Sequence, residues 1–429
     1  MSNGAAFSAG IFRVTNFRRL WTSNLFGDVG SGFASVALVV TAVQFLHATT
    51  LEAAIVAGLE RGAYLILGIP IGVWVDRLPQ RVMLFGADLL RFAAAASIPV
   101  AFWVGHLTIE QLMVVALLVG VGNIFYDVTH TTVLPEVVGR GRVHEASARL
   151  QTVDSTAAVV MPGASGWLIA ISAAPVPYIA TAAAHLLSSL FVARITGTTK
   201  PPREAGEARE PFFAAVRTGF VFIGTNTLLR AMMFVAAVNN FGAGVIGGVF
   251  AVFFLRTLHQ TSATLGLVMS IGALGGIVGA LTGLPIRRRL GEIRAQFPAY
   301  ALIGLSMAAL PLSPTLPFSP VFTITVAEFL VSLAITVSAI CSSGVNARMT
   351  PAPLLGRVTS ARRVVSIGAV PLGTLAGGVI GTATNPDTAL WVGAISMLCC
   401  VPLLLASPAR RLRDLPPEFT ASQVEATTA

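Results

Sequence analysis

Long apolar stretches alternate with short polar connections along most of the chain. A helix needs about 20 mainly apolar residues to cross a bilayer, and the pattern predicts twelve segments of that kind. The expected spans are Leu20–Leu46, Glu52–Val75, Val82–Val104, Ile109–Thr131, Glu145–Ile171, Pro177–Thr196, Leu228–Leu255, Thr261–Ile286, Ala295–Leu312, Pro320–Val345, Gly356–Thr382 and Thr388–Ala406. The sequence therefore predicts an all-α membrane protein with twelve transmembrane helices.

The composition supports this interpretation. Of the 429 residues, 55% are hydrophobic and 11% are charged, whereas a soluble domain carries about 25% charged residues. The net charge of +9 comes almost wholly from arginines in loops between apolar segments, and this topological pattern excludes a nucleic-acid partner. Cys341, Cys399 and Cys400 lie in apolar runs, so we expect free buried thiols.

The positions of the arginines also predict the orientation in the membrane. Short cytoplasmic loops collect Lys and Arg. With twelve spans, the basic residues of the loops fall on one side, the other side holds only Arg256, and Arg61 and Arg91 lie inside expected helices. We therefore expect both termini in the cytoplasm.

The two halves of the chain resemble each other. Gly275–Arg289 lies between the eighth and ninth spans, as Gly72–Leu84 lies between the second and third. A repeated six-helix unit is typical of transporters whose substrate site lies near the membrane midplane between the halves. The expected domains are an N-terminal six-helix bundle (1–196), a cytoplasmic central loop with a surface helix (197–227), a C-terminal six-helix bundle (228–406) and a flexible cytoplasmic tail (407–429).

A short charged connection, GVWVDRLPQRVML, joins the second and third spans. Its residues Gly72, Asp76, Arg77 and Arg81 resemble motif A of the major facilitator superfamily, which runs roughly G-x-x-x-D-R-x-G-R-R. The stretches NFRRLWTSNLFGDVGSG and LLGRVTSARRVVSIGAVPLGTLAGG are similar to the branch that contains enterobactin exporters and macrolide efflux proteins. The resemblance covers the whole chain and implies the major facilitator fold in a bacterial inner-membrane exporter driven by proton antiport.

The resemblance also implies a gate on the cytoplasmic side. Arg77 or Arg81 would pair with Asp127 at the cytoplasmic end of the fourth span and close that side. The alternative is that both arginines only fix the topology.

The fifth span carries a stretch similar to motif C of antiporters, G-P-x-x-G-G, with Met161 in place of the first glycine. Pro162 would bend the helix, and Gly166 would permit close packing against the eighth span. The candidate residues of this stretch are Pro162, Gly163 and Gly166.

Two acidic residues lie well inside expected spans. Asp28 and Glu328 are each about nine residues into their segment, roughly 13 Å at 1.5 Å per residue. A charged side chain at membrane depth costs about 2.5–3.5 kcal/mol on insertion scales and is by default a functional hypothesis. We interpret Asp28 as a proton carrier and Glu328 as a proton carrier or a carboxylate for a cationic substrate. A hydrogen-bonded structural acid is the alternative for each.

Other charged residues inside the spans need partners. Glu60 and Arg61 are adjacent, so they cannot pair on one helix face, whereas Asp88 and Arg91 are three apart and can pair directly. Arg91 is also a candidate counter-ion for Asp28 or Glu60.

Three more polar residues in the spans are candidates for the substrate cavity. Asp154 would line the cavity or bond the backbone of the eighth span. Asn239 and Asn240 would line the cavity or hold helices together.

The sequence therefore predicts a secondary active exporter of a hydrophobic or amphipathic small molecule, driven by proton antiport and alternating access. The alternative is a siderophore or lysolipid exporter, or a uniporter without proton coupling. A phosphate-binding loop and a nucleophile–base set are both missing from the sequence, so we expect no enzyme, no cofactor and no metal. The expected partners are the substrate, protons and the lipid bilayer, and we expect a monomer.

Overall fold

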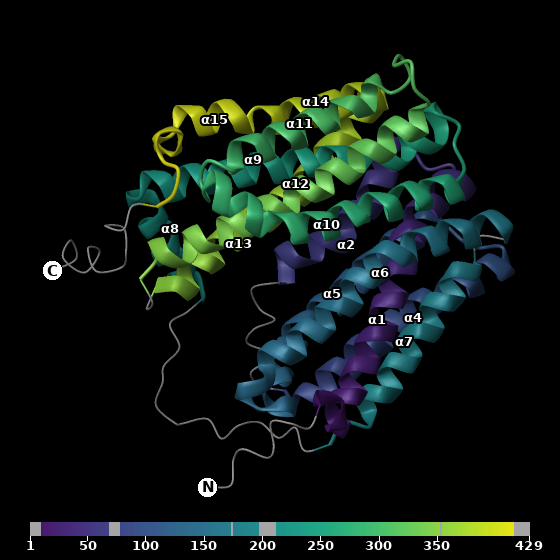
Figure 1. The fold of residues 1–429 in the computed structure, drawn as a ribbon. Coiled ribbons are helices and arrows are strands. Elements are labelled where there is room, and N and C mark those ends of the chain that lie inside the picture. The colour runs from purple at the N-terminus through teal and green to yellow at the C-terminus, as the bar shows by residue number, and fades with distance from the viewer. Residues whose placement is uncertain (1–9, 68–77, 173–174, 197–211, 352–353, 416–429) are drawn as a thin grey trace, which may run out of the picture. The chain divides into compact units, whose positions relative to one another are not determined.

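The computed structural model describes residues 10–67, 78–172, 175–196, 212–351 and 354–415. Every regular element in these ranges is a helix (Figure 1). The chain divides into two compact units. The first comprises Met1–His47, Leu59–Glu207 and Thr261–Gly266, and the second comprises Ala48–Gly58, Ala208–Gln260 and Leu267–Ala429.

The first unit is a bundle of long helices. α1 packs against α6 and α7, and α4 packs against α5 and α7 (Figure 1). Phe17, Leu84 and Leu150 are buried in its core. The helices of this unit are α1 (Thr15–Val40), the C-terminal part of α2 (Thr50–Leu67), α4 (Gln80–Val104), α5 (Ile109–Val138), α6 (Val143–Ile171) and α7 (Val176–Ala193), with 3-10 turns at Ile11–Arg13 and Arg140–Arg142.

The second unit is built in the same way. α9 packs along α13 and α14, α11 packs against α12 and α14, and α8 lies against α13. Its helices are α8 (Phe212–Thr225), α9 (Thr227–Val252), most of α10 (Ser262–Leu290), α11 (Gln296–Leu312), α12 (Pro320–Met349), α13 (Leu355–Ala383), α14 (Pro386–Leu398) and α15 (Cys400–Ala406), with a 3-10 turn at Pro408–Arg411.

The prediction of an all-α membrane protein is confirmed. Nine helices in the described part of the chain are long and apolar enough to cross a membrane. The other three expected spans correspond to α2, α6 and α11, which are also helical. α2 carries three charged side chains, α6 carries three in its first half, and α11 is only 17 residues long.

Among the described helices, α5 extends furthest beyond its predicted bounds. The fourth span was expected to end at Thr131, but α5 continues to Val138 with Pro135 inside it. Val133 and Leu134 are buried in the core of the first unit. Burial of these side chains extends the helix past the apolar window, and Gly139, at φ +78°, ends it.

The last expected span is interrupted at Cys399, between α14 and α15. Pro402 has no N–H, and its ring would clash with the carbonyl of Leu398 in a continuous helix. Cys341 and Cys400 are buried free thiols, but the expectation is wrong for Cys399, which is exposed. Cys399 and Cys400 differ because adjacent helical positions point about 100° apart.

The ends of α1 and α9 repeat the same unusual backbone. Each helix finishes in a five-residue π-helical turn, Thr41–Phe45 in one and Phe253–Thr257 in the other. A Leu-His pair follows each turn, and both His47 and His259 have φ +51°. A positive φ is uncommon for a residue with a side chain, so its presence at matching points supports the repeat seen in the sequence.

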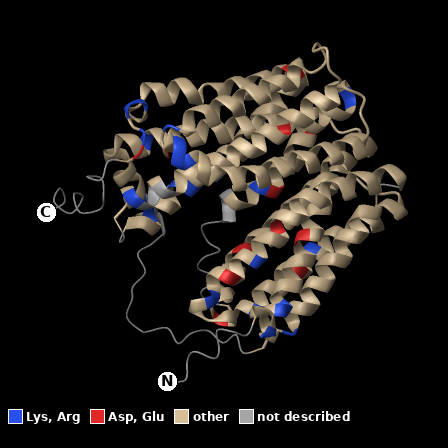
Figure 2. Cartoon of the chain, in the orientation of Figure 1, with Lys and Arg blue, Asp and Glu red and all other residues tan. Residues whose placement is uncertain are grey.

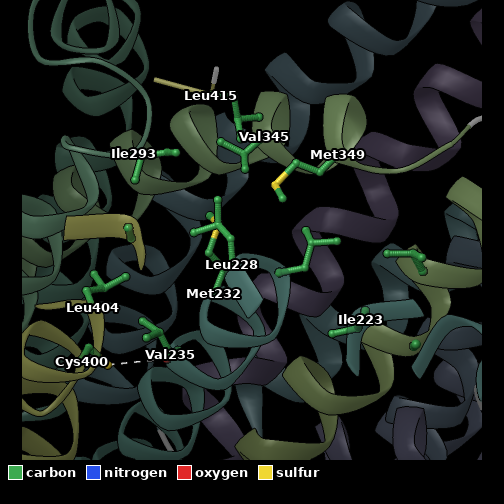
Figure 3. Packing of buried hydrophobic residues seen from close by; sticks show 14 residues of the cluster. Ile223, Leu228, Met232, Val235, Ile293, Val345, Met349, Cys400, Leu404 and Leu415 are labelled. Atoms are coloured by element: carbon green, nitrogen blue, oxygen red, sulfur yellow. Dashed lines mark hydrogen bonds between the residues drawn. The ribbon is translucent and has the colours of Figure 1, made fainter. Parts of the chain in front are cut away.

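Part of the expected tail is ordered and packed onto the second unit. The backbone N–H groups of Ile293 and Arg294 donate to the carbonyl of Arg413. Leu415 is buried in the same cluster as Val345 of α12 (Figure 3). The expectation of a flexible tail is therefore wrong for residues 407–415, because an apolar side chain and backbone hydrogen bonds hold this segment against the second unit.

Basic residues gather near one end of the helices within each unit (Figure 2). In the first unit, Arg19 donates to the carbonyl of Arg194, and Arg81 donates to the carbonyl of Ala193, where α7 ends. Cationic side chains are favoured there because the last carbonyls of a helix carry partial negative charge. The segregation agrees with the charge asymmetry of the predicted loops, while the cytoplasmic location of that end stays a prediction.

Candidate functional site

An acidic pocket of about 300 Å³ lies among α1, α2 and α6 in the first unit. Asp28, Glu60 and Asp154 come from these three helices, and no basic side chain is among the lining residues. The pocket is lined by Asp28, Ser31, Gly32, Ser35, Glu60, Asp154, Ala157, Ala158 and Pro162. The structure therefore brings together three acidic residues that the sequence places far apart.

Helical periodicity explains which residues reach the pocket. On α1, Asp28 is followed by lining residues three, four and seven positions later, and on α6, Asp154 is followed by lining residues three, four and eight positions later. Residues at these spacings share one face of a helix. A polar stripe of α1 thus faces a stripe of small residues on α6, which leaves open space beside the carboxyl groups.

Asn24 connects two of the pocket acids. Its Nδ2 donates to Oδ2 of Asp28 at 2.8 Å and to Oδ1 of Asp154 at 2.9 Å. An amide NH₂ has two hydrogens, so one buried group holds two carboxyl groups side by side. Asn24 was not among the predicted site residues, although its position four residues before Asp28 puts both on one face of α1.

A buried polar cluster lies behind the pocket. The expected pairing of Asp88 and Arg91 is confirmed, and both side chains are buried, at 0% and 3% exposure. Asp88 also accepts from Ser188 Oγ at 2.6 Å. The guanidinium of Arg91 lies over the ring of Tyr126, with 4.6 Å from Cζ to the ring centroid. A pairing within one helix was predictable, whereas the partners from α5 and α7 were not.

Arg61 and Glu60 lie in different environments, as their adjacency requires. Arg61 is exposed on α2, whereas Glu60 is partly buried. Asn123 of α5 donates to Glu60, and the same residue accepts from Arg91.

The candidate residues of the second unit form a separate group. Glu328 on α12 is partly buried and packs against Gly272 of α10, where an added Cβ would lie 2.8 Å from the Cβ of Glu328. Asn240 donates to the carbonyl of Ser366 at 2.9 Å and so ties α9 to α13. Asn239 is buried, and its Oδ1 has no hydrogen-bond partner among the described residues.

The predicted cytoplasmic gate is only partly visible. Gly72, Asp76 and Arg77 lie outside the described residues. Arg81 contacts the end of α7, and Asp127 accepts a hydrogen bond from Tyr64 of α2. The proposed pairing of motif A with Asp127 therefore stays a prediction.

The fifth-span motif lies at a close helix contact. Pro162 lines the pocket, Gly163 follows it in α6, and Gly166 lies against the start of α10. A Cβ on Gly166 would lie 3.0 Å from the Cα of Gly266, and a Cβ on Gly266 would overlap the carbonyl of Pro162. Glycine at both positions lets the two backbones touch.

His, Cys, Asp and Glu are the side chains that most often bind metal ions in proteins. In the ranges that the structure describes, no group of three or more His, Cys, Asp and Glu side chains is placed to hold a metal ion. The site is a hydrogen-bonded set of carboxyl groups beside a cavity.

Residues 6–424 match the family of transmembrane secretion effectors within the major facilitator superfamily. The chain belongs to this family. It is 26% identical over 400 residues to the multidrug efflux pump Tap of Mycolicibacterium fortuitum, covering 91% of this chain and 95% of Tap. It is 21% identical over 318 residues to macrolide efflux protein A of Streptococcus pyogenes, covering 73% of this chain and 76% of that protein.

Solved structures share the fold. A bacterial homologue of the iron transporter ferroportin, crystallised in an inward-facing state, is similar with a TM-score of 0.74 at 13% identity, covering 93% of this chain and 99% of that one. The expected major facilitator fold is confirmed. The chain is a multi-pass efflux transporter related to multidrug and macrolide efflux pumps, and not an enzyme.

Proposed function

We propose that the chain exports a hydrophobic or amphipathic small molecule, such as a drug-like compound or secondary metabolite, in exchange for protons by alternating access. Its relatives, which include a multidrug efflux pump and a macrolide efflux protein, support this substrate class. The protein would lie in a bacterial plasma membrane as a monomer with both termini in the cytoplasm, gated by motif A.

The observation that carries this proposal is the convergence of Asp28, Glu60 and Asp154 on one pocket without a basic lining residue. Ionised carboxyl groups that share a site repel each other. A proton relieves this repulsion, and so does a cationic group of the substrate. Because both would use the same carboxyl groups, the binding of one displaces the other, which is the requirement for exchange.

Proteoliposomes with an imposed pH gradient test this proposal, with ethidium, a lipophilic cation, as the probe. We expect Asp28→Asn and Asp154→Asn each to reduce gradient-driven transport by about tenfold, the scale of one lost charge interaction of about 1.4 kcal/mol. Glu145→Gln is the matched control, because Glu145 is an exposed acid on α6 and does not line the pocket.

Two results contradict the proposal. One is wild-type transport that ignores the pH gradient, which indicates a uniporter. The other is unchanged gradient-driven transport in the double variant Asp28→Asn with Glu328→Gln, because these two residues are the proposed proton carriers at membrane depth.

A lysolipid is a second candidate substrate, favoured by one observation in the second unit. An apolar groove of about 360 Å³ lies between α11 and α12 and is lined by residues that include Leu305, Phe318 and Phe322. These three side chains are more than half exposed, and a groove of this chemistry suits an acyl chain. Competition between lysophosphatidylcholine and ethidium for transport is expected if this candidate is correct.

A further inference from the structure

Hydrogen bonds lead from the acidic pocket into the buried core of the first unit. Glu60, which lines the pocket, accepts from Nδ2 of Asn123 with 3.4 Å between Nδ2 and Oε1. The Oδ1 of Asn123 accepts from Nη1 of Arg91 at 3.0 Å, and Arg91 is paired with Asp88. Asn123 is thus a neutral link between a pocket acid and a buried ion pair.

The chemistry of its neighbours fixes the orientation of the Asn123 amide. An arginine side chain can only donate, so Oδ1 must face Arg91 and Nδ2 must face Glu60. Nδ2 also only donates, and its best acceptor is a carboxylate, because charge-assisted hydrogen bonds are about twice as strong as neutral ones. A proton on Oε1 of Glu60 would put two donors face to face. Turning the amide to relieve this conflict would break its bond to Arg91.

Close helix packing on both sides holds the backbone at Asn123 in place. A Cβ on Gly120 would overlap the backbone carbonyl of Glu60, and a Cβ on Gly122 would lie 3.1 Å from Cδ of Arg91. These glycines let α5 approach α2 and α4 closely. Because packed interiors deform little, the Asn123 side chain moves when the protonation state of Glu60 changes, and the helix backbone does not.

We propose that Asn123 is a positioning residue that couples the protonation state of Glu60 to the Arg91–Asp88 pair. Through this link, occupancy of the pocket on α2 is transmitted to α4. The inference rests on the proposed proton exchange. The other charged or titratable groups on the elements around Glu60 include Arg61 and Tyr64 on α2, Asp28 on α1, Asp88 and Arg91 on α4, Tyr126, Asp127 and His130 on α5, Asp154 on α6 and His185 on α7.

Asn123→Asp is the sharpest test. Aspartate has nearly the same shape and still accepts from Arg91, but it has no donor for Glu60 and adds a negative charge. Both changes favour the proton-bound form of Glu60, so the pH of half-maximal ethidium transport moves upward. We expect a shift of about one pH unit, a tenfold change in proton affinity. Transport is measured down an ethidium gradient across a pH series, which does not require proton coupling.

Two comparisons separate positioning from a merely structural role. Asn385→Asp is the matched control, because Asn385 caps α14 through its Oδ1 and aspartate caps a helix equally well. We expect its pH profile to equal that of the wild type. In a Glu60→Gln background, Asn123→Asp should produce no further shift, because the group through which it acts is absent.

The outcomes also separate this inference from the proposed function. If gradient-driven transport by the wild type responds to pH but Asn123→Asp lowers the rate without moving the midpoint, the inference is wrong and proton exchange stands. The inference is also wrong if Asn123→Asp shifts the pH midpoint equally in the Glu60→Gln background. If the wild type ignores the pH gradient, both are wrong. Should Asn123→Asp not fold, Asn123→Ser, too short to bridge both partners, must also shift the midpoint upward, but by less than one pH unit because it removes the donor without adding a charge.

Discussion

Gly166→Ala tests the packing of α6 against α10 in the first unit. A methyl group added at this position would lie 3.0 Å from the Cα of Gly266 and 3.1 Å from its backbone N, and it would overlap the carbonyl oxygen of Ser262. All three contacts are with backbone atoms, so no side-chain rotation relieves them. The two helices must therefore separate if the substitution is accepted.

The size of the effect follows from the cost of overpacking. An extra methyl group in a closely packed site costs about 1–3 kcal/mol, which lowers the population of the packed arrangement by about 5- to 150-fold. If the α6–α10 contact belongs to a step of the transport cycle, ethidium transport should fall by at least about fivefold. Thermal unfolding of the purified protein should shift downward at the same time.

Gly247→Ala on α9 provides the matched control. No atom lies within 4 Å of a Cβ built on Gly247, so the same chemical change should leave the transport rate as in the wild type and should not lower the unfolding temperature, because alanine is favoured over glycine inside a helix. A Gly166→Ala protein with wild-type transport and an unchanged unfolding temperature would refute the close backbone contact and its role.

Two further substitutions test the buried charges. Arg348→Ala leaves the carboxyl group of Glu292, only 3% exposed, without its ion-pair partner. We expect a loss of about 1–3 kcal/mol in unfolding free energy, below the full cost of breaking a buried pair because Arg348 is 48% exposed, and a shifted thermal unfolding curve measures it. Ser188→Ala removes the 2.6 Å hydrogen bond to Asp88 and should cost about 1–3 kcal/mol. Among the described residues, the hydroxyl of the neighbouring Ser189 bonds only within its own helix. Ser189→Ala should therefore cost less in the same assay, and equal losses would contradict the importance of the Asp88 contact.

The positions of the spans could be predicted because the apolar window records a membrane-length requirement directly. The end of α5 could not, because Pro135 and Glu136 interrupt the apolar pattern where the helix continues. What extends it is the burial of Val133 and Leu134, a tertiary contact that a linear pattern does not contain. Pro402 indicates the break at Cys399 locally, but the apolar pattern alone predicts one continuous span there.

Candidate charges could be predicted one at a time, because each carries a cost inside a membrane. Their grouping could be predicted only where two charges share a helix, as Asp88 and Arg91 do. The neutral partners Asn24 and Asn123 could not be predicted in this way, because an asparagine in a span has little energetic cost of its own. Asn24 and Asn123 are nevertheless the residues that join the acids to one another and to Arg91.

The two units share features of backbone structure but differ in where their acidic side chains lie. Their equivalence extends to the π-helical turns and to His47 and His259 at φ +51°. Yet the first unit places Asp28, Glu60 and Asp154 around one pocket, while the second offers Glu328 beside Gly272. A repeated fold sets the helix positions in both units, so this difference comes from side chains alone. Substitutions of acidic residues in the first unit should therefore change the pH dependence of transport more than substitutions in the second unit do.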